Sequence, residues 1–361
     1  MTNQLIPAQV ATPGDILSME LEARGWTQKD LAEIMGRPVQ TINAIINAKK
    51  EITPETAIEL AAAFDIPAEF WTNLETNYRL HLAKKKHDNA GISRRSRLYA
   101  IAPVSELVKR QWLPKTQTIE ELEKAVCEFL GIASPAETPK SIVNFRHNKD
   151  LEPEEIGLTA WTKRAEHLSK KQTVANFDRA ILEAAIPELL NYAQNLEDIS
   201  KVPKFLMSLG VHFVIVPHLS QTYMEGATFT IDDNPVIALT LRYNRIDAFW
   251  FTLMHKLGYL VAGHTGIFID DLKNLADNPQ ENEANQFARD WLINPDDLAQ
   301  LIKTCSHRYT QVVIEEFAAS QKRHPGIIVG RLQHEKEISY KNHRQYLVKV
   351  DKFLSEWFDK S

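Results

Sequence analysis

The sequence predicts a multidomain, mainly α-helical protein with a small β-sheet in its C-terminal part. Its 361 residues exceed the roughly 150 of one typical domain. Apolar residues recur at helical spacing along most of the chain, whereas runs rich in Val, Ile, Phe and Thr gather between residues 211 and 241. With 44% apolar and 25% charged residues, the chain can bury proper cores. We predict three domains, at residues 1–82, 83–200 and 201–361.

Composition and motifs exclude several protein classes. No segment approaches the ~18 consecutive apolar residues of a membrane span, and the first residues lack the basic and apolar regions of a signal peptide. Cys127 and Cys305 lie far apart and outside any C-x-x-C motif, which argues against a disulfide framework or a thiolate zinc site. We therefore predict a soluble, cytoplasmic protein with no cofactor and no membrane partner.

Positive charge gathers locally, although the net charge is -5. Residues 84–110 hold eight Lys or Arg residues against two acidic ones. Such a basic stripe is consistent with contact to nucleic-acid phosphates. It is equally consistent with a solvated helix face, so both interpretations stay open.

The N-terminal region predicts five short helices. Thr27 and Thr53 are typical caps for the second and fourth helices, and Gly36 makes the turn between the second and third. On the second helix, Leu31 and Ile34 are expected to face inward. Two short helices joined by a glycine-containing turn favour a helix-turn-helix.

Two sequence runs carry a family resemblance: TQKDLA at 27–32 and ITPETA at 52–57. Together with the five-helix pattern they resemble the Xre-type helix-turn-helix, and the run 52–80 resembles the HigA group of antitoxins. The resemblance implies an operator-binding domain whose group usually neutralises a ribosome-dependent endoribonuclease, so a HigB-like toxin is an expected partner. One small helix-turn-helix makes few base contacts and a palindromic operator doubles them, which predicts a homodimer.

The third helix is predicted to enter the major groove. Gln and Asn can read adenine through a paired acceptor and donor, and a Val methyl can touch thymine. The predicted base-reading residues are the exposed early positions Val39, Gln40, Thr41 and Asn43. By the family resemblance, the residues that hold phosphates are Gln28, Asn47 and Lys49.

Residues 83–200 read as a mostly helical connector without catalytic spacing. The predicted helices are 103–109, 119–130, 158–167 and 177–193. Residues 145–146 and 159–161 resemble the connector of long HigA-like proteins that carry a peptidase-like domain. The segment is expected to orient the two ends of the chain or to form a dimer surface.

The stretch 249–264 predicts a buried helix, with Asp247 as its N-cap. On a zinc peptidase helix, the pattern H-E-x-x-H places two metal-binding imidazoles one turn apart, and the glutamate deprotonates the bound water. The residues at these positions are His255, Lys256 and Tyr259. An ammonium thus replaces the general base, and a phenol that ionises near pH 10 replaces the second imidazole.

A third ligand position, Glu281, lies on the next predicted helix. The strand-like run 226–232, His255 and Glu281 together resemble the ImmA/IrrE family of metallopeptidase domains, which have a zincin-like fold and of which some cleave DNA-bound repressors. The resemblance implies that His255 and Glu281 correspond to two metal ligands, Lys256 to the catalytic glutamate and Tyr259 to a missing histidine. We predict that these positions are vestigial, with no catalytic residue, no bound metal and no enzyme activity.

The remaining C-terminal patterns concern a sheet and a tail. Strand-like runs at 211–216, 227–231 and 236–241 predict a small sheet packed on the helix 249–264. Since peptidases of this shape hold substrate at an edge strand, we expect an extended peptide to bind there unless the chain itself covers the edge. Residues 346–358 predict an amphipathic helix packed on its own domain.

These patterns predict a sequence-specific DNA-binding antitoxin and autorepressor of a toxin–antitoxin module. Its catalytically inactive peptidase-like domain is expected to bind the toxin, a peptide or a ligand. Two alternatives stay open: a stand-alone transcriptional regulator with a sensor domain, and an active metallopeptidase that cleaves a regulator.

Overall fold

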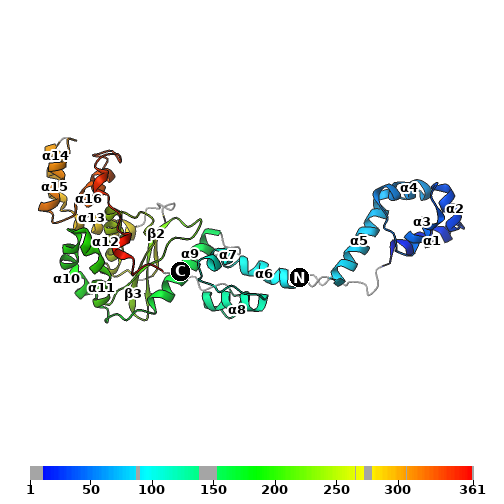
Figure 1. Cartoon of the computed structure of the whole chain (residues 1–361), viewed down its shortest axis with the longest axis horizontal. Helices are drawn as coiled ribbons and strands as arrows, with labels where there is room; N and C mark the ends of the chain where they lie inside the picture. Colours follow the sequence, from blue (N-terminus) through cyan, green and yellow to red (C-terminus); the bar gives the residue numbers. More distant parts are fainter. Residues whose placement is uncertain are drawn as a thin grey trace. The chain divides into compact units, whose positions relative to one another are not determined.

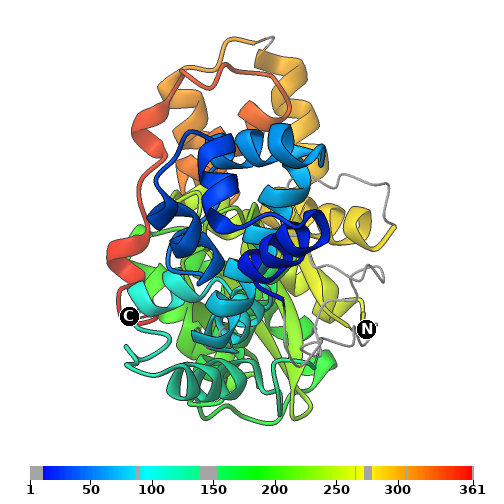
Figure 2. The same ribbon diagram turned by 90° about the vertical axis from the view of Figure 1, so that its right-hand side faces the viewer.

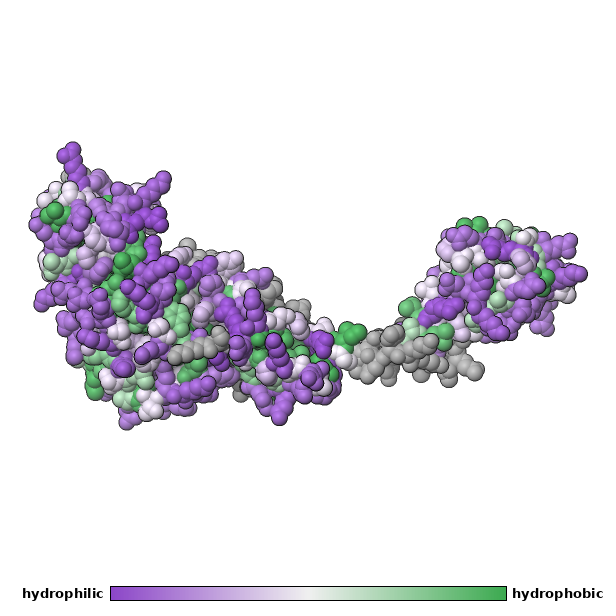
Figure 3. Space-filling view, viewed as in Figure 1, coloured by the Kyte–Doolittle hydropathy of each residue, from purple (hydrophilic) through white to green (hydrophobic). Residues whose placement is uncertain are grey.

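The computed structural model describes residues 11–86, 90–137, 153–264, 266–271, 279–305 and 307–359. The chain forms two compact units, residues 1–93 (the N-terminal unit) and 94–361 (the C-terminal unit). The described ranges are mainly α-helical with a four-stranded sheet, which confirms the predicted fold class. None of their helices is long and apolar enough to cross a membrane, and the visible face of each unit is largely hydrophilic (Figure 3).

Helices make up the described part of the N-terminal unit (Figure 1). They are α1 (Pro13–Arg24), α2 (Gln28–Ile34), α3 (Val39–Ile46), α4 (Pro54–Phe64) and α5 (Ala68–Lys86), with α6 (Ala90–Tyr99) following. The side chains of Thr27 and Thr53 accept hydrogen bonds from the backbone N–H groups of Asp30 and Thr56, as expected of helix caps. Gly36 takes a left-handed φ of 62° in the turn between α2 and α3.

One side-chain direction predicted for the core of this unit was wrong. Leu31 is fully buried, but Ile34, predicted to face inward, is 50% exposed. Because a residue turns by about 100° along a helix, Ala32 and Met35 continue the buried face of α2 on the side of Leu31 away from Ile34. Gly14 lies so close to α3 that a Cβ there would be 2.0 Å from the Ile46 carbonyl oxygen.

The sheet of the C-terminal unit has the strand order β1-β3-β2-β4. Its strands are β1 (His212–Ile215), β2 (Met224–Ile231), β3 (Asn234–Leu239) and β4 (Phe268–Asp271). β1 pairs with β3 in parallel, and β2 pairs antiparallel with both β3 and β4. The first three strands were predicted, whereas β4 was not.

Helices cover both faces of the sheet. Val214, Ala227 and Ala238 face a layer formed by α6, α7 (Val104–Lys109), α8 (Ile119–Leu130) and α9 (Pro153–Ser169). The alternate residues Phe213 and Ile237 face a second layer. Its elements are α10 (Arg179–Leu189), η1 (Leu190–Ala193), η2 (Leu196–Lys201), α11 (Val202–Ser208), α12 (Ile246–Val261), α13 (Pro279–Leu292), α14 (Pro295–Cys305), α15 (Gln311–Ser320) and α16 (Pro325–His334). This alternation is the period-two pattern of a strand buried on both sides.

The predicted connector is divided differently from the three-domain prediction. Its helices form where expected, but residues 94–200 belong to the C-terminal unit and not to a separate body. Trp161 of α9 shows the integration, since its indole N–H donates to the Val216 carbonyl at 2.8 Å.

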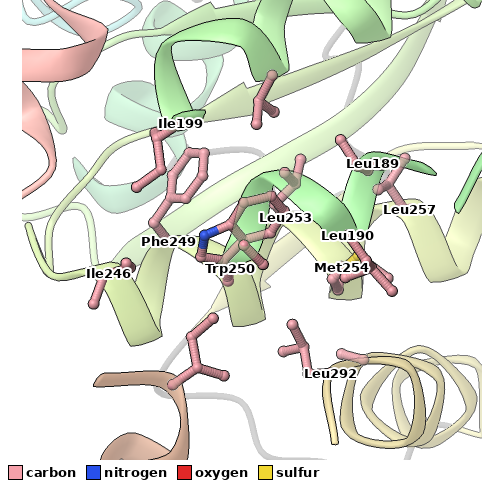
Figure 4. Packing of buried hydrophobic residues seen from close by; sticks show 14 of the residues in the cluster. Leu189, Leu190, Ile199, Ile246, Phe249, Trp250, Leu253, Met254, Leu257 and Leu292 are labelled. Atoms are coloured by element: carbon pink, nitrogen blue, oxygen red, sulfur yellow. The ribbon is translucent and has the colours of Figure 1, made fainter. Parts of the chain in front are cut away.

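Helix α12 is the buried centre of the second layer. Figure 4 shows Trp250, Leu253 and Leu257 of α12 among side chains from neighbouring elements. The helix begins at Ile246 with Arg245 at the N-cap position, so the prediction of Asp247 as N-cap was wrong. Asp247 instead accepts two hydrogen bonds from Arg245, the Nε–Oδ1 contact being 3.0 Å.

The predicted C-terminal helix 346–358 was also wrong. Among the described residues there, only the short elements η3 (Arg344–Tyr346) and α17 (Asp351–Leu354) form, joined by irregular chain (Figure 2). The apolar residues still pack on their own unit, with Val350 and Leu354 fully buried. The chain then pairs with β1, where the Ile215 N–H donates to the Trp357 carbonyl at 3.2 Å. One edge of the sheet is therefore covered by the chain itself.

Candidate DNA interface and the His255 cluster

Helix α3 presents a polar face to solvent because its apolar residues are buried in the core. Ile42 and Ile45 are buried, which leaves Val39, Gln40 and Asn43 exposed on the other side. Pro38 precedes the helix with extended backbone, so its fixed φ starts α3 at a defined residue. The predicted base-reading residues therefore lie on the solvent side of α3, with Thr41 half-buried.

Three of the predicted DNA-contacting side chains bond to one another. The Asn43 side-chain amide donates to the Gln28 side-chain carbonyl at 3.2 Å. Asn47 donates to the backbone carbonyl of Asn43 at 2.8 Å and to its side-chain oxygen at 3.2 Å. This network fixes the Asn43 side chain between α2 and the end of α3.

Gln40 and Lys49 lie outside that network. Neither side chain has a hydrogen bond or ion pair with any residue that the structure describes, and both are exposed. Lys49 follows α3, where its backbone N–H donates to the Ala44 carbonyl at 2.8 Å. Gln40 can thus reach a base edge, and Lys49 a phosphate, without breaking an existing bond.

An ion pair fixes the turn that orients α3. Arg37, in the turn after α2, donates to both carboxylate oxygens of Glu59 on α4, with the Nη2–Oε1 distance 2.8 Å. This hydrogen bond lowers the pKa of Glu59 below its ordinary value. Bidentate arginine pairs restrict geometry as well as adding energy. Neither residue belongs to the DNA-contacting set predicted from the sequence.

Two arginines of the basic stripe at 84–110 pair with acidic residues of the C-terminal unit. Arg94 bonds to the carboxylates of Glu120 and Glu123, the second at 2.8 Å. Arg110 pairs with Glu106 at 2.8 Å and also donates to the Pro217 carbonyl. These two arginines have structural partners, which favours the helix-face interpretation at their positions.

The predicted metal-site residues come together on α12 and α13. We call His255, Lys256, Tyr259 and Glu281 the His255 cluster. The first three, on α12, are almost completely buried. Gly258 makes the approach of α13 possible, since a Cβ there would lie 3.0 Å from the Ala284 Cα.

Glu281 joins His255 to Tyr259. Its Oε1 lies 3.5 Å from His255 Nε2, and its Oε2 accepts a hydrogen bond from the Tyr259 hydroxyl. The rings of His255 and Tyr259 meet edge to face at 5.0 Å. The Tyr259 phenol is therefore hydrogen-bonded to one oxygen of Glu281, the carboxylate that would be a metal ligand.

Lys256 connects α12 to strand β4. The side chain is fully buried, and its Nζ donates to the Phe268 carbonyl at 3.2 Å. The Phe268 ring stacks on Tyr259 with centroids 4.3 Å apart, and Lys256 Nζ lies 5.4 Å from the centroid of the same Tyr259 ring. A buried ammonium needs such partners, because desolvation of a charge is costly.

His264 also reaches the rim of the cluster. After the left-handed Gly263, its ring comes within 6.1 Å of the Tyr259 ring. Its Nε2, however, lies 2.8 Å from Glu283, which is a separate pair. In the described part of the chain, no group of three or more His, Cys, Asp or Glu side chains is arranged to hold a metal ion.

The residues present do not fit the zinc ion that the sequence resemblance implies. A zincin site needs two imidazoles and a carboxylate around the metal, and a carboxylate as general base. In their places the Tyr259 hydroxyl donates a hydrogen bond to Glu281, and Lys256 brings its side chain beside the site. In this structure the side-chain contacts of the cluster connect α12, α13 and β4.

Comparison with known proteins identifies both units. Residues 17–71 match a family described as "Helix-turn-helix", and residues 208–322 match the "IrrE N-terminal-like domain". The second match contains His255, Lys256, Tyr259 and Glu281.

Individual relatives match the N-terminal unit. The chain is 40% identical over 65 residues to "Uncharacterized HTH-type transcriptional regulator YbaQ" of Escherichia coli (18% of this chain, 58% of the relative). It is 43% identical over 63 residues to "Antitoxin HigA-1" of Vibrio cholerae (17% and 59%). The chain thus spans little more than half the length of these relatives. A solved HigA-family addiction module antidote protein from Coxiella burnetii is 35% identical over 22% of this chain and 86% of that chain, with a TM-score of 0.21.

Proposed function

Because the chain belongs to the HigA-like helix-turn-helix family in its N-terminal unit and carries an IrrE-like domain in its C-terminal unit, we propose that it is a DNA-binding antitoxin and autorepressor. Its N-terminal unit binds an operator as a homodimer. Its C-terminal unit is a catalytically inactive domain that binds a toxin, a peptide or a small ligand. A DNA-binding role places the protein in the cytoplasm.

The observation that supports DNA binding best is the exposed face of α3. Gln40 and Val39 are exposed at its start, while Gln28 and Asn47 hold Asn43 in one orientation. A pre-ordered face loses less side-chain entropy on binding, and its amide groups suit adenine edges in the major groove. Gln28, Thr41, Asn47 and Lys49 surround this face as predicted phosphate or base contacts.

The inactivity of the C-terminal unit is supported by the His255 cluster. Lys256 cannot act as a general base in its protonated form, and the Tyr259 hydroxyl is bonded to Glu281. Restoring a peptidase would need both positions to change. The competing proposal of an active metallopeptidase would be revived by stoichiometric zinc in protein purified without chelators.

The toxin role is tested by affinity capture of the full chain from its native host, with identification of the proteins and DNA that co-elute. A small protein in fixed ratio, toxic when expressed alone, is the expected result; a HigB-like endoribonuclease fits the resemblance. Recovery of one operator without any protein partner would contradict the antitoxin role.

That second outcome would favour the stand-alone regulator. In such a protein the C-terminal unit is a sensor, and a cavity beside the His255 cluster is the observation in its favour. Both candidates share DNA binding, so they differ only in what the C-terminal unit recognises.

A further inference from the structure

A cavity of about 280 Å³ lies beside the His255 cluster, between α12, α13 and α16, which are neighbours in the C-terminal unit (Figure 1). Phe251 of α12 belongs to its wall and stacks on the His255 ring with centroids 6.3 Å apart. The volume is at the small end of the range of ~300–1,000 Å³ typical of ligand pockets. It suits a small molecule and not a large cofactor.

The wall of the cavity combines apolar and charged side chains. Ala248, Phe251, Leu292 and Ile327 supply the apolar surface. The charged lining residues are three arginines and two carboxylates: Arg245, Arg289, Arg331, Glu225 and Asp247. With His334 neutral, three positive charges minus two negative ones leave a net charge of +1.

The arginines differ in how well they are paired. Arg245 is matched by Asp247 in a two-point ion pair. The Nε of Arg289 is buried and has no hydrogen-bond partner among the residues that the structure describes. Arg331 Nε lies 2.9 Å from the Glu335 carboxylate but without hydrogen-bond geometry. Arg289 Nε is therefore an unused donor, whereas Arg331 Nε is ion-paired with Glu335.

A fourth arginine, Arg323, has a purely structural role nearby. Arg323 donates to the carbonyls of Leu292 and Trp291, both at 3.0 Å, and so closes the end of α13. Burial has the largest effect on the pKa of Arg331 and lowers it. The Glu335 carboxylate raises this pKa, whereas the positive charge of Arg289 lowers it. An anion near both guanidiniums would relieve this repulsion and supply the missing acceptor.

We propose that this cavity binds a small organic carboxylate, with the carboxylate at Arg289 and Arg331 and the apolar body against Phe251 and Ile327. Guanidinium groups pair with carboxylates through two parallel hydrogen bonds. The net charge of +1 favours a single negative charge over a dianionic phosphate. The inference rests on the proposed binding role of the C-terminal unit and supplies its ligand class.

The test measures binding of phenylacetate, uncharged phenylacetamide and phenyl phosphate to the full chain by calorimetric titration. We expect phenylacetate to bind at least about 10-fold more tightly than the amide, a difference of about 1.4 kcal/mol. Arg289→Gln should remove that preference, whereas Arg308→Gln, at an exposed arginine outside the cavity, should keep it. Ala248→Phe adds a ring to the wall of the cavity, so it should weaken the binding of both phenylacetate and phenylacetamide.

Several results would overturn the inference. They are equal binding of acid and amide, an unchanged preference in Arg289→Gln, no binding of any probe, or tighter binding of phenyl phosphate. Operator binding and thermal unfolding are measured on the same preparations. A folded protein that binds its operator but fails the probe test overturns the ligand assignment alone, whereas loss of operator binding with intact probe binding counts against the DNA-binding function alone.

Discussion

At the scale of single residues, Gln40 should carry sequence discrimination and Lys49 should not. Gln40→Ala removes an exposed amide with no described hydrogen-bond partner, so nothing in the fold depends on it. We expect a loss of about 1–3 kcal/mol that depends on the operator base it reads. Competition assays with operator variants, each differing at one base pair, measure this dependence.

Lys49→Ala, just after the other end of α3, is the matched control. It should weaken binding to all DNA sequences alike and reduce the salt slope by about 1. If Gln40→Ala also weakened binding to all sequences equally, its assignment as a base reader would be wrong.

The residue scale also shows how the predicted site residues lie. His255, Tyr259 and Glu281 were expected to correspond to one site, and in the structure Glu281 contacts both of the other two side chains. The bond from Lys256 to Phe268 was not foreseeable, because it depends on strand β4, which the sequence did not reveal. The network of Asn43, Gln28 and Asn47 was likewise missed, since it depends on how α2 crosses α3.

At the scale of elements, the contact between α1 and α3 should tolerate no side chain at position 14. A Cβ on Gly14 would meet the Ile46 carbonyl, which belongs to a backbone that cannot rotate away. We expect Gly14→Ala to lower the free energy of unfolding of the N-terminal unit by about 1–3 kcal/mol. Urea denaturation followed by circular dichroism measures it.

Gly91→Ala is the control for the same unit. A Cβ at Gly91 in α6 would meet nothing within 4 Å, so alanine should be neutral or stabilise by about 0.5–1 kcal/mol through helix propensity. Equal effects of the two substitutions would show that the α1–α3 contact does not constrain position 14.

The start of α16 should make stability sensitive to acid. His324 is its N-cap, and its Nδ1 accepts the Gly326 N–H at 3.0 Å, which requires an unprotonated nitrogen. Burial lowers the pKa of His324 from its ordinary value of 6.5. The unfolded chain then takes up a proton that the folded protein does not, so the free energy of unfolding falls as pH drops from 6.5 through the folded-state pKa.

His324→Asn keeps a cap acceptor but cannot titrate, so it should flatten part of that pH dependence. The remaining slope comes from other histidines whose pKa is lowered by burial, among them His212. Denaturant unfolding at several pH values between about 5 and 7.5 measures both proteins. An identical slope in the two would rule out His324 as the source.

Elements were predicted well where local chemistry decides them. Thr27 and Thr53 mark helix starts because a side-chain oxygen caps free N–H groups. Strand β4 was missed because four residues ending in two aspartates lack the strand pattern, and only pairing with β2 defines it. The apolar spacing of 346–358 suggested a helix, but the same residues reach the core from irregular chain that pairs with β1.

At the scale of the whole molecule, the two units should unfold separately. The N-terminal unit has its own core, in which Leu60 is fully buried. Leu60→Ala should cost that unit about 2–5 kcal/mol and weaken operator binding on warming. The second transition, from the C-terminal unit, should stay at its original temperature in a calorimetric scan; a shift of both transitions together would contradict two independent units.

The boundary between the two units could not be predicted from helical periodicity alone. Helical spacing located α7 to α10 but could not tell that α9 covers a sheet formed more than forty residues later in the sequence. The predicted connector therefore appeared separate, although its residues from 94 onward complete the C-terminal core. Long-range packing, and not local pattern, determines such a boundary.

We propose that the C-terminal unit keeps the framework of a zinc peptidase while Lys256 and Tyr259 occupy the places of its base and second imidazole. The most direct test is the zinc content of full-length protein purified without chelators. We predict far less than one zinc per chain, and about one in the double variant Lys256→Glu, Tyr259→His, which restores H-E-x-x-H and serves as the positive control. One tightly held zinc per wild-type chain would contradict the account.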